Sequence, residues 1–249
     1  MSEWIHTTAK IGKSVQMGHN AVIGENVQVG DHVQIGHHVV IHPDTIIGNN
    51  IRIDDHAVLG KNPMRSTAIA IKQSEHLPPL QIGEDTMIGT GAVLYRGARI
   101  GNKCLIADYA SVREESSVGD VTIIGRSTVV ENKVTIGKHC KVETNVFVPA
   151  FSEIGNHCFI APHVVFTNDN FMGRTEERKK HFKGVTIQDG GRLGANSTIL
   201  PGVTIQTDGV AGAGAVVTHD IPSQQMVVGV PAKHFKQVSS EQLLNIDNG

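Results

Sequence analysis

Apolar residues recur along this chain with a period of six. An aliphatic residue, Met or Phe occupies every sixth position over residues 11–59, 82–166 and 187–205, and Gly usually follows it. A small residue lies four positions later, so that Val27 and Val29, for example, fit the inward face of one short strand. Gly gives the backbone freedom to turn a corner. Three such sides predict an 18-residue coil whose strands stack in parallel about 4.8 Å apart.

Two long insertions, 61–81 and 167–186, interrupt the hexads without changing their phase. When every third hexad is compared, those from Ile11-Gly12-Lys13 to Ile154-Gly155-Asn156 all read aliphatic, Gly, polar, which predicts an edge that faces water. The other two edges deviate, as at Glu143-Thr144 and Arg113-Glu114, and we expect them to meet something other than solvent. Both insertions leave from one of these irregular edges and should project from the same side.

The pattern predicts a single elongated domain over residues 1–238, with about ten coils and the two loops inserted into it. The register is expected to slip within the Gly/Ala-rich segment 209–216. Residues 239–249 form a short C-terminal helix or tail, and residues 239–246 are expected to cover the open end of the last coil.

Composition and charge limit which partners the protein can bind and where in the cell it is expected. The 249 residues are 39% hydrophobic and 4% aromatic, which suits a sizeable but narrow core. The formal charge of −2, without a dense basic run, excludes the electrostatic footprint of a nucleic-acid partner. No apolar run approaches the roughly 20 residues of a membrane span, and residues 1–10 lack a signal-peptide pattern, so we expect no membrane and a cytoplasmic location. The three cysteines, Cys104, Cys140 and Cys158, occupy small inward positions and are predicted to be free core thiols.

These hexads resemble the hexapeptide-repeat family, whose known fold is an all-β, left-handed parallel β-helix. The handedness comes from this resemblance, because parallel crossovers are otherwise right-handed. Members of the family assemble as three parallel subunits with active sites between them. The resemblance therefore implies a homotrimer, in agreement with the two irregular edges.

A closer resemblance covers residues 140–236. Phe166-Thr167-Asn168-Asp169, followed by Arg174, resembles a segment of bacterial nucleotide-sugar N-acyltransferases with this fold, although Asn-Phe-Met-Gly here precedes the Arg. The resemblance implies that Asn168, Asp169 and Arg174 bind the sugar or its amine. The alternative for Asn168 and Asp169 is an ordinary loop-capping role.

The same family binds coenzyme A along its C-terminal coils. Small residues let a pantetheine arm approach the backbone, whose outward N–H groups can bind its amides. The segments 194–205, 212–218 and 228–233 match that family. The resemblance implies cofactor contacts from Ala195, Asn196, Gly212, Ala213, Lys233 and Lys236. The two lysines have an equally simple interpretation as solvated surface residues.

Acyl transfer to an amine needs a proton acceptor near the amine and an N–H donor at the oxyanion. Residues 141–146 resemble the family segment in which an Asn approaches the reacting amine, which implies that role for Asn145. Glu143 stands where Gly is usual and is a candidate to orient the amine or take its proton, unless it is an ordinary turn carboxylate. His163 is a second candidate base. Some family members are thought to use the substrate's sulfur or water instead of a protein base.

Together these features predict an N-acyltransferase that moves an acyl group, acetyl being favoured, from coenzyme A to the amino group of a nucleotide-linked sugar or of a non-sugar acceptor. The insertion 61–81 either contacts the nucleotide across a neighbour's cleft or is a surface flap. The 14 histidines, with His32, His37 and His42 spaced by five, raise the rival of a zinc enzyme like the trimeric carbonic anhydrase of this fold. Most of these histidines, however, occupy outward turn positions, so no metal is expected. A catalytically idle scaffold is the third possibility.

Overall fold

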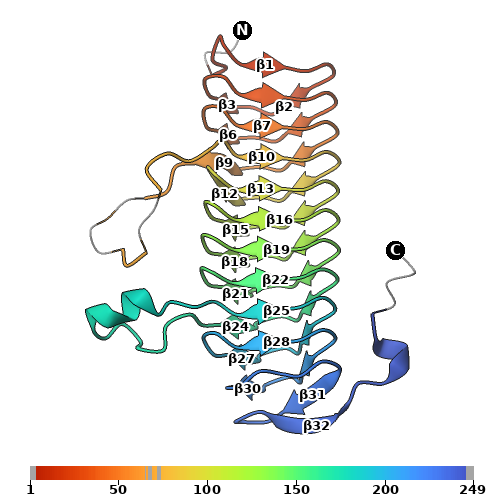
Figure 1. The fold of residues 1–249 in the computed structure, drawn as a ribbon. Helices are drawn as coiled ribbons and strands as arrows, with labels where there is room; N and C mark the ends of the chain where they lie inside the picture. The colour runs from red at the N-terminus through yellow and green to blue at the C-terminus, as the bar shows by residue number, and fades with distance from the viewer. Residues whose placement is uncertain (1–3, 65, 67–68, 72–73, 245–249) are drawn as a thin grey trace.

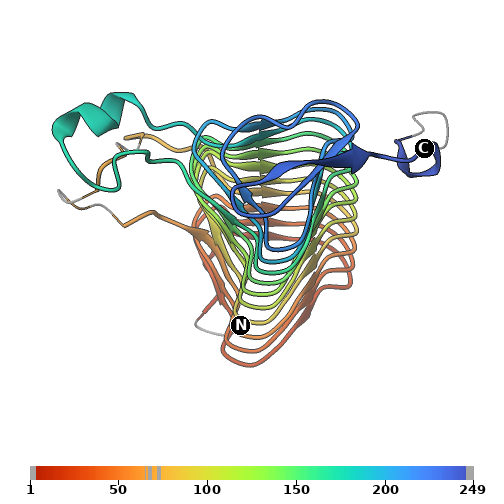
Figure 2. The ribbon, with the colours of Figure 1, turned by 90° about the horizontal axis from the view of Figure 1, so that it is seen from below.

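The chain winds into a three-sided column of stacked coils (Figures 1 and 2). The computed structural model describes residues 4–64, 66, 69–71 and 74–244. Three parallel sheets, here called sheets 1, 2 and 3 in chain order, form the sides of the left-handed β-helix, and corners 1–2, 2–3 and 3–1 join them.

The strands are short and nearly identical in length. Sheet 1 contains β1 (Lys10–Ile11), β4 (Gln28–Val29), β7 (Ile46–Ile47), β10 (Gln81–Ile82), β13 (Arg99–Ile100), β16 (Ser117–Val118), β19 (Thr135–Ile136), β22 (Glu153–Ile154), β25 (Thr186–Ile187) and β28 (Thr204–Ile205). Sheet 2 contains β2 (Gln16–Met17), β5 (Gln34–Ile35), β8 (Arg52–Ile53), β11 (Met87–Ile88), β14 (Leu105–Ile106), β17 (Ile123–Ile124), β20 (Lys141–Val142), β23 (Phe159–Ile160), β26 (Arg192–Leu193), β29 (Val210–Ala211), β31 (Gln225–Val228) and β32 (Lys233–Gln237). Sheet 3 contains β3 (Val22–Ile23), β6 (Val40–Ile41), β9 (Val58–Lys61), β12 (Val93–Tyr95), β15 (Ser111–Val112), β18 (Val129–Val130), β21 (Phe147–Val148), β24 (Val165–Phe166), β27 (Thr198–Ile199) and β30 (Val216–Val217).

Strand pairing confirms the 18-residue coil. Ile11 pairs with Val29, and the same spacing recurs through the uninterrupted coils. Across the insertions, Ile82 pairs with Ile47 and Ile187 pairs with Ile154, so both insertions preserve the phase. The hexad aliphatic residues point inward and form a continuous core, in which Phe166 is completely buried.

The corner glycines have a different role from the one expected. At Gly137 the backbone does not adopt a positive φ; that conformation falls two residues later, at His139, with φ of 56°. A Cβ on Gly137 would lie 2.6 Å from the carbonyl carbon of Gly155 in the next coil. Gly is therefore required by the close stacking of coils, and the left-handed position is taken mainly by Asn, Asp, His and Lys.

Buried hydroxyl and thiol groups form a column beside corner 1–2. The three cysteines are free and buried, as predicted. The Thr122 hydroxyl donates to the carbonyl of Gly137 at 2.9 Å, and the Cys140 thiol makes the equivalent bond to Gly155 at 3.0 Å. Cysteine therefore takes the place of threonine in this column.

The C-terminal coils differ from the prediction in two ways. Val217 still pairs with Ile199, whereas Ile221 bridges Ile205, which is only 16 residues earlier. The register thus slips after Val217, and the slip expected within 209–216 is wrong. β31 and β32 form an antiparallel pair at the end of sheet 2.

The predicted C-terminal helix is reduced to the 3-10 helix η2 (Ser240–Gln242). This segment does not cover the open end of the column, because it returns along the side of the column (Figure 1) and the Leu244 N–H donates to Asp208 Oδ1 at 3.0 Å. Residues 245–249 lie outside the described part. Over the described ranges, no helix has the length and apolar character of a membrane span.

Two arms project from corner 3–1 on the same side of the column, as expected (Figures 1 and 2). The first arm, residues 62–80, is anchored by Arg96, whose guanidinium donates to the carbonyls of Leu77 and Pro43 and pairs with Asp44, each at 3.0 Å. The second arm, residues 167–185, contains the 3-10 helix η1 (Glu176–Lys180), which the sequence pattern did not indicate.

Candidate functional site

The predicted catalytic residues and four of the predicted cofactor residues share one edge of the column, corner 2–3. Strands β20, β23, β26 and β29 end there in successive coils. Backbone bonds link those coils: the His163 N–H donates to the Thr144 carbonyl at 3.0 Å, and the Asn196 N–H donates to the Pro162 carbonyl at 3.1 Å. Glu143, Asn145, His163, Ala195, Asn196, Gly212 and Ala213 therefore lie in one column.

Asn145, His163 and Asn196 occupy the same position in three consecutive turns. Each adopts the left-handed conformation, with φ of 58°, 61° and 58°, and each is exposed. None of the three side chains bonds to another described residue, so all three remain available to a ligand. The carboxylate of the half-buried Glu143 likewise has no partner within the described chain.

A ladder of side chains along corner 2–3 ends just before this region. Nearer the N-terminus, three second turn residues accept a backbone N–H from the coil before them: His37 Nδ1 accepts from His19, Asp55 from His37, and Asp108 from Thr90, whereas Thr90 itself accepts none from Asp55. Thr144, Pro162 and Ala195 hold this position further along, and they continue no such ladder. The ladder thus ends at Asp108.

The end of the ladder leaves backbone donors free on the outer surface. The N–H groups of Thr144, Ala195 and Ala213 donate to no other residue in the described ranges. Nearby, a Cβ on Gly214 would meet no atom within 4 Å, so the surface is open there. Corner 2–3 therefore offers N–H donors, two amides and an imidazole along a surface of small residues.

The predicted substrate residues are placed elsewhere. Asn168, Asp169 and Arg174 belong to the second arm at corner 3–1, and sheet 3 separates them from Asn145. Arg174 is exposed, and its guanidinium has no partner among the described residues. Within one chain, the structure does not bring these residues to corner 2–3.

Asp169 organises the second arm. Its Oδ1 accepts the Phe171 N–H at 2.9 Å, and its Oδ2 accepts the Gly173 N–H and Arg178 Nη1, both at 3.0 Å. Burial alone raises the pKa of this carboxyl, but these hydrogen bonds and the Arg178 charge bring the pKa below its usual range. These contacts are those of a loop-capping residue, and the partner arginine is Arg178 rather than Arg174.

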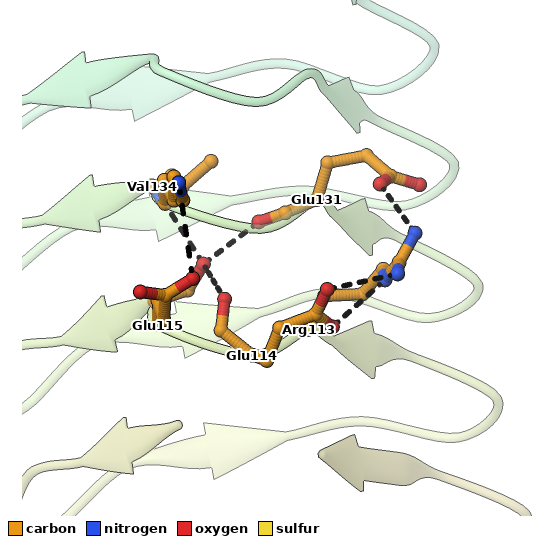
Figure 3. Close-up of polar contacts among 7 residues, drawn as sticks. Arg113, Glu114, Glu115, Glu131 and Val134 are labelled. Atoms are coloured by element: carbon orange, nitrogen blue, oxygen red, sulfur yellow. Dashed lines mark hydrogen bonds and ion pairs between the residues drawn. The ribbon is translucent and has the colours of Figure 1, made fainter. Parts of the chain in front are cut away.

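A charged cluster on corner 3–1, between the two arms, was not assigned a role from the sequence (Figure 3). The Glu114 side chain is 0% exposed, and both its oxygens accept from Arg113, at 3.1 Å from Nε and 2.9 Å from Nη2. Glu131 from the next coil accepts from Nη1 of the same guanidinium at 2.9 Å. The only signal in the sequence is the replacement of Gly by charged residues at this corner.

The remaining predicted groups lie apart from one another. Lys233 and Lys236 are exposed on β32, beyond the Gly/Ala-rich coils. His19 and His37 stack with ring centroids 5.3 Å apart, as their spacing predicts. Among the described residues, no three His, Cys, Asp or Glu side chains come close enough together to hold a metal ion. A cavity of about 580 Å³ at the base of the first arm is lined by Asn62, Pro63, Glu75, His76, Leu77 and Arg96.

Family models match three parts of the chain. Residues 26–61 match the bacterial transferase hexapeptide of six repeats, and residues 79–107 and 184–219 match the hexapeptide repeat of succinyl-transferase. The 2,3,4,5-tetrahydropyridine-2,6-dicarboxylate N-acetyltransferase of Staphylococcus carnosus is 54% identical over 55 residues, 22% of this chain and 23% of that protein. Its Staphylococcus aureus (strain JH9) counterpart is 40% identical over 58 residues, 23% and 24% of the two chains. The chain thus spans about a quarter of the length of these curated relatives.

Similarity to this chain is also found among solved structures. UDP-N-acetylglucosamine O-acyltransferase (LpxA) from Moraxella catarrhalis is 22% identical, over 98% of this chain and 79% of that one, with a TM-score of 0.42. PerB from Caulobacter crescentus, solved with CoA and GDP-perosamine, is 25% identical, over 58% and 54% of the two chains, with a TM-score of 0.40.

Proposed function

We propose that this hexapeptide-repeat protein transfers an acyl group, with acetyl favoured, from coenzyme A to the amino group of a nucleotide-linked sugar. The observation that carries the proposal is the C-terminal half of corner 2–3, where free N–H groups and the column Asn145, His163 and Asn196 face outward along small residues. The matched transferase repeats and the N-acetyltransferase relatives support the reaction class. The segment 166–169, which resembles part of the nucleotide-sugar N-acyltransferases, supports a nucleotide-linked amino sugar as the acceptor.

The chemistry follows from these groups. The acceptor amine attacks the thioester carbonyl, a C–N bond forms, the C–S bond breaks, and coenzyme A leaves as its thiol after taking up a proton. Asn145 holds the amine, and His163 accepts the proton that the amine loses, with Glu143 as the second acceptor at this corner. The free N–H groups of Thr144 and Ala195 lie on the coils before and after His163, and one of the two would donate to the oxyanion, since two coil rises separate them.

A homotrimer would complete this site. The outward residues of sheet 3 are mostly apolar, and Phe147 and Val165 are 38% and 40% exposed, whereas the outward residues of sheet 1 are mostly polar. Sheet 3 lies between corners 2–3 and 3–1, so a second copy packed on it would place its own edge beside one of these corners. We therefore propose that Asn168 and Arg174 of one subunit reach the acceptor bound at corner 2–3 of the next, and that Asp169 shapes the arm.

The test is an assay for thiol release with acetyl-CoA and a panel of UDP- and dTDP-linked amino sugars. Asn145→Ala should lower kcat more than tenfold with at least one acceptor. Asn20→Ala is the matched control, because Asn20 has the same turn position and the same left-handed backbone (φ 59°) at corner 2–3 near the N-terminus. Equal rates for both variants would remove Asn145 from the mechanism.

Two other outcomes would overturn the proposed function itself. No thiol release across the panel, together with stoichiometric zinc in the purified protein, would favour the zinc-enzyme alternative. An intact trimer that gives no calorimetric signal with coenzyme A would favour a scaffold without catalysis. Turnover with an amine that carries no sugar would keep the acyltransferase and replace the acceptor class.

A further inference from the structure

Arg192, on the outer face of sheet 2, has two buried donors without an acceptor. Its Nε and Nη2 atoms are inaccessible to solvent and have no hydrogen-bond partner in the described chain, although the residue as a whole is only partly buried. Desolvating charged donors without providing an acceptor is unfavourable. This pair of N–H groups is therefore suited to an anion.

The two nitrogens belong to the same edge of the guanidinium. Arg113 in this chain shows what that edge binds, because its Nε and Nη2 each donate to one oxygen of Glu114, at 3.1 and 2.9 Å. Such a fork fits two oxygens of a carboxylate or a phosphate equally well. Arg192 presents the same fork without the carboxylate.

Asp189 and Asp208, two carboxylates of the neighbouring corner 1–2, bond to other residues. Asp189 Oδ1 accepts the Asn156 N–H at 2.7 Å, and Asp208 Oδ1 accepts the Leu244 N–H at 3.0 Å. Neither carboxylate forms an ion pair with Arg192. Among the residues that the structure describes, no carboxylate accepts from Nε or Nη2 of Arg192.

A stripe of outward side chains runs through Arg192 along sheet 2. Successive strands pair Lys141 with Phe159, Phe159 with Arg192, Arg192 with Val210, Val210 with Met226, and Met226 with Lys236. This sheet 2 stripe holds three cations, three apolar side chains and no carboxylate. It suits a ligand that combines several phosphates with apolar surface.

We propose that Arg192 binds a phosphate of coenzyme A through its Nε–H and Nη2–H groups, with Lys236 meeting a second phosphate further along the sheet 2 stripe. The inference rests on the proposed function and names the anion-binding residue of that site. Arg192 precedes Gly194 by two residues, and Gly194 begins the turn of Ala195 and Asn196 at corner 2–3. A ligand with its thiol end on that corner therefore runs toward sheet 2, where the groups that cover the two Arg192 nitrogens move aside when a phosphate binds.

Calorimetric titration of the full chain with coenzyme A, dephospho-coenzyme A and pantetheine tests this role. Arg192→Met should weaken coenzyme A binding at least tenfold and leave pantetheine binding unchanged, whereas Arg192→Lys should fall between Arg192→Met and the parent. If Arg192→Met weakens the binding of dephospho-coenzyme A as much as that of coenzyme A, Arg192 binds the diphosphate. If dephospho-coenzyme A loses less affinity, Arg192 binds the 3′-phosphate. Arg52→Met is the matched control, since Arg52 lies on the same face of sheet 2 but is exposed and paired with Asp54 at 2.7 Å.

Thermal unfolding of the ligand-free variants gives a second readout. Arg192→Met removes a buried unpaired charge, so its Tm should equal or exceed that of the parent, whereas a structural role for Arg192 would lower it. Parent-like coenzyme A affinity, a lowered Tm or an equal loss of pantetheine binding would each overturn the assignment. If the parent chain itself binds no coenzyme A, the proposed function fails first; if it binds and Arg192→Met binds equally, only the role of Arg192 fails.

Discussion

The buried carboxylate of Glu114 offers the sharpest stability test. Glu114→Gln keeps the shape of the side chain but turns an NH₂ group toward one of the two Arg113 donors, so one charge-assisted hydrogen bond, worth about 1.5–3 kcal/mol, is replaced by a repulsive contact. Breaking a buried ion pair costs about 3–5 kcal/mol. Because the Arg113 side chain is 23% exposed and keeps Glu131, we expect a loss below that range, about 2–3 kcal/mol.

Urea unfolding followed by circular dichroism measures this loss as a lower midpoint. Glu115→Gln is the control, because the adjacent Glu115 side chain is 29% exposed and its ion pair with Lys133, at 4.0 Å, is worth less than about 1 kcal/mol. The Gln carbonyl can still accept the hydrogen bond that the Ser74 hydroxyl donates to Glu115 Oε1 at 2.7 Å. Replacing Arg113 and Glu114 together by Met should recover part of the stability that Glu114→Gln loses, since no fully buried charge is left unpaired and Glu131, which loses Arg113, is 27% exposed. Equal midpoints for Glu114→Gln and Glu115→Gln would refute the reasoning.

Three further predictions concern single positions. Cys140→Thr should change the free energy of unfolding by less than about 1 kcal/mol, because Thr122 fills the equivalent place in the preceding coil and Thr can donate to the same carbonyl. A larger loss in urea unfolding would contradict the equivalence of Cys and Thr in this column. Gly137→Ala should destabilise by about 1–3 kcal/mol in the same assay, since its Cβ would lie 2.6 Å from the next coil. Burial, followed by the charge of Lys61, lowers the pKa of His42 below its ordinary value of about 6.5. The folded state therefore binds fewer protons, and stability should be constant above pH 6.5 and fall as the pH drops below it. His42→Asn should flatten that fall in unfolding measurements from pH 5 to 8.

The fold could be predicted because a single rule repeats along the chain. Each coil must place its inward residues on those of the next, so the period alone gives the pairing of Ile11 with Val29 and of Ile187 with Ile154. The reason for the corner Gly could not be predicted, because the hexad pattern does not separate backbone freedom from close stacking. Ala211 and Val217 still continue the six-residue period, and the slip comes only after Val217. The Gly/Ala-rich composition of residues 209–216 therefore suggested a slip at the wrong place.

The candidate site was predictable only in part. The position of Asn145, His163 and Asn196 on one edge follows from the period. The bonds of Asp169 to Phe171 and Gly173 depend on a local loop conformation that hexads do not describe. The burial of the Arg192 donors depends on the side chains of neighbouring strands, so it becomes visible only in three dimensions.

The contrast between the corners explains where chemistry can reside. Along corner 1–2, Asp31 accepts the Lys13 N–H at 2.7 Å, Asp120 accepts the Asn102 N–H at 2.9 Å, and Asp189 accepts the Asn156 N–H at 2.7 Å, so the regular polar residue of each hexad stabilises the coil before it. A side chain bonded in this way has less capacity for a substrate. At corner 2–3 the same ladder stops after Asp108, and both the backbone donors and the outward side chains of the later coils are released together. The irregular hexads that weaken the repeat are thus the ones that can bind a ligand.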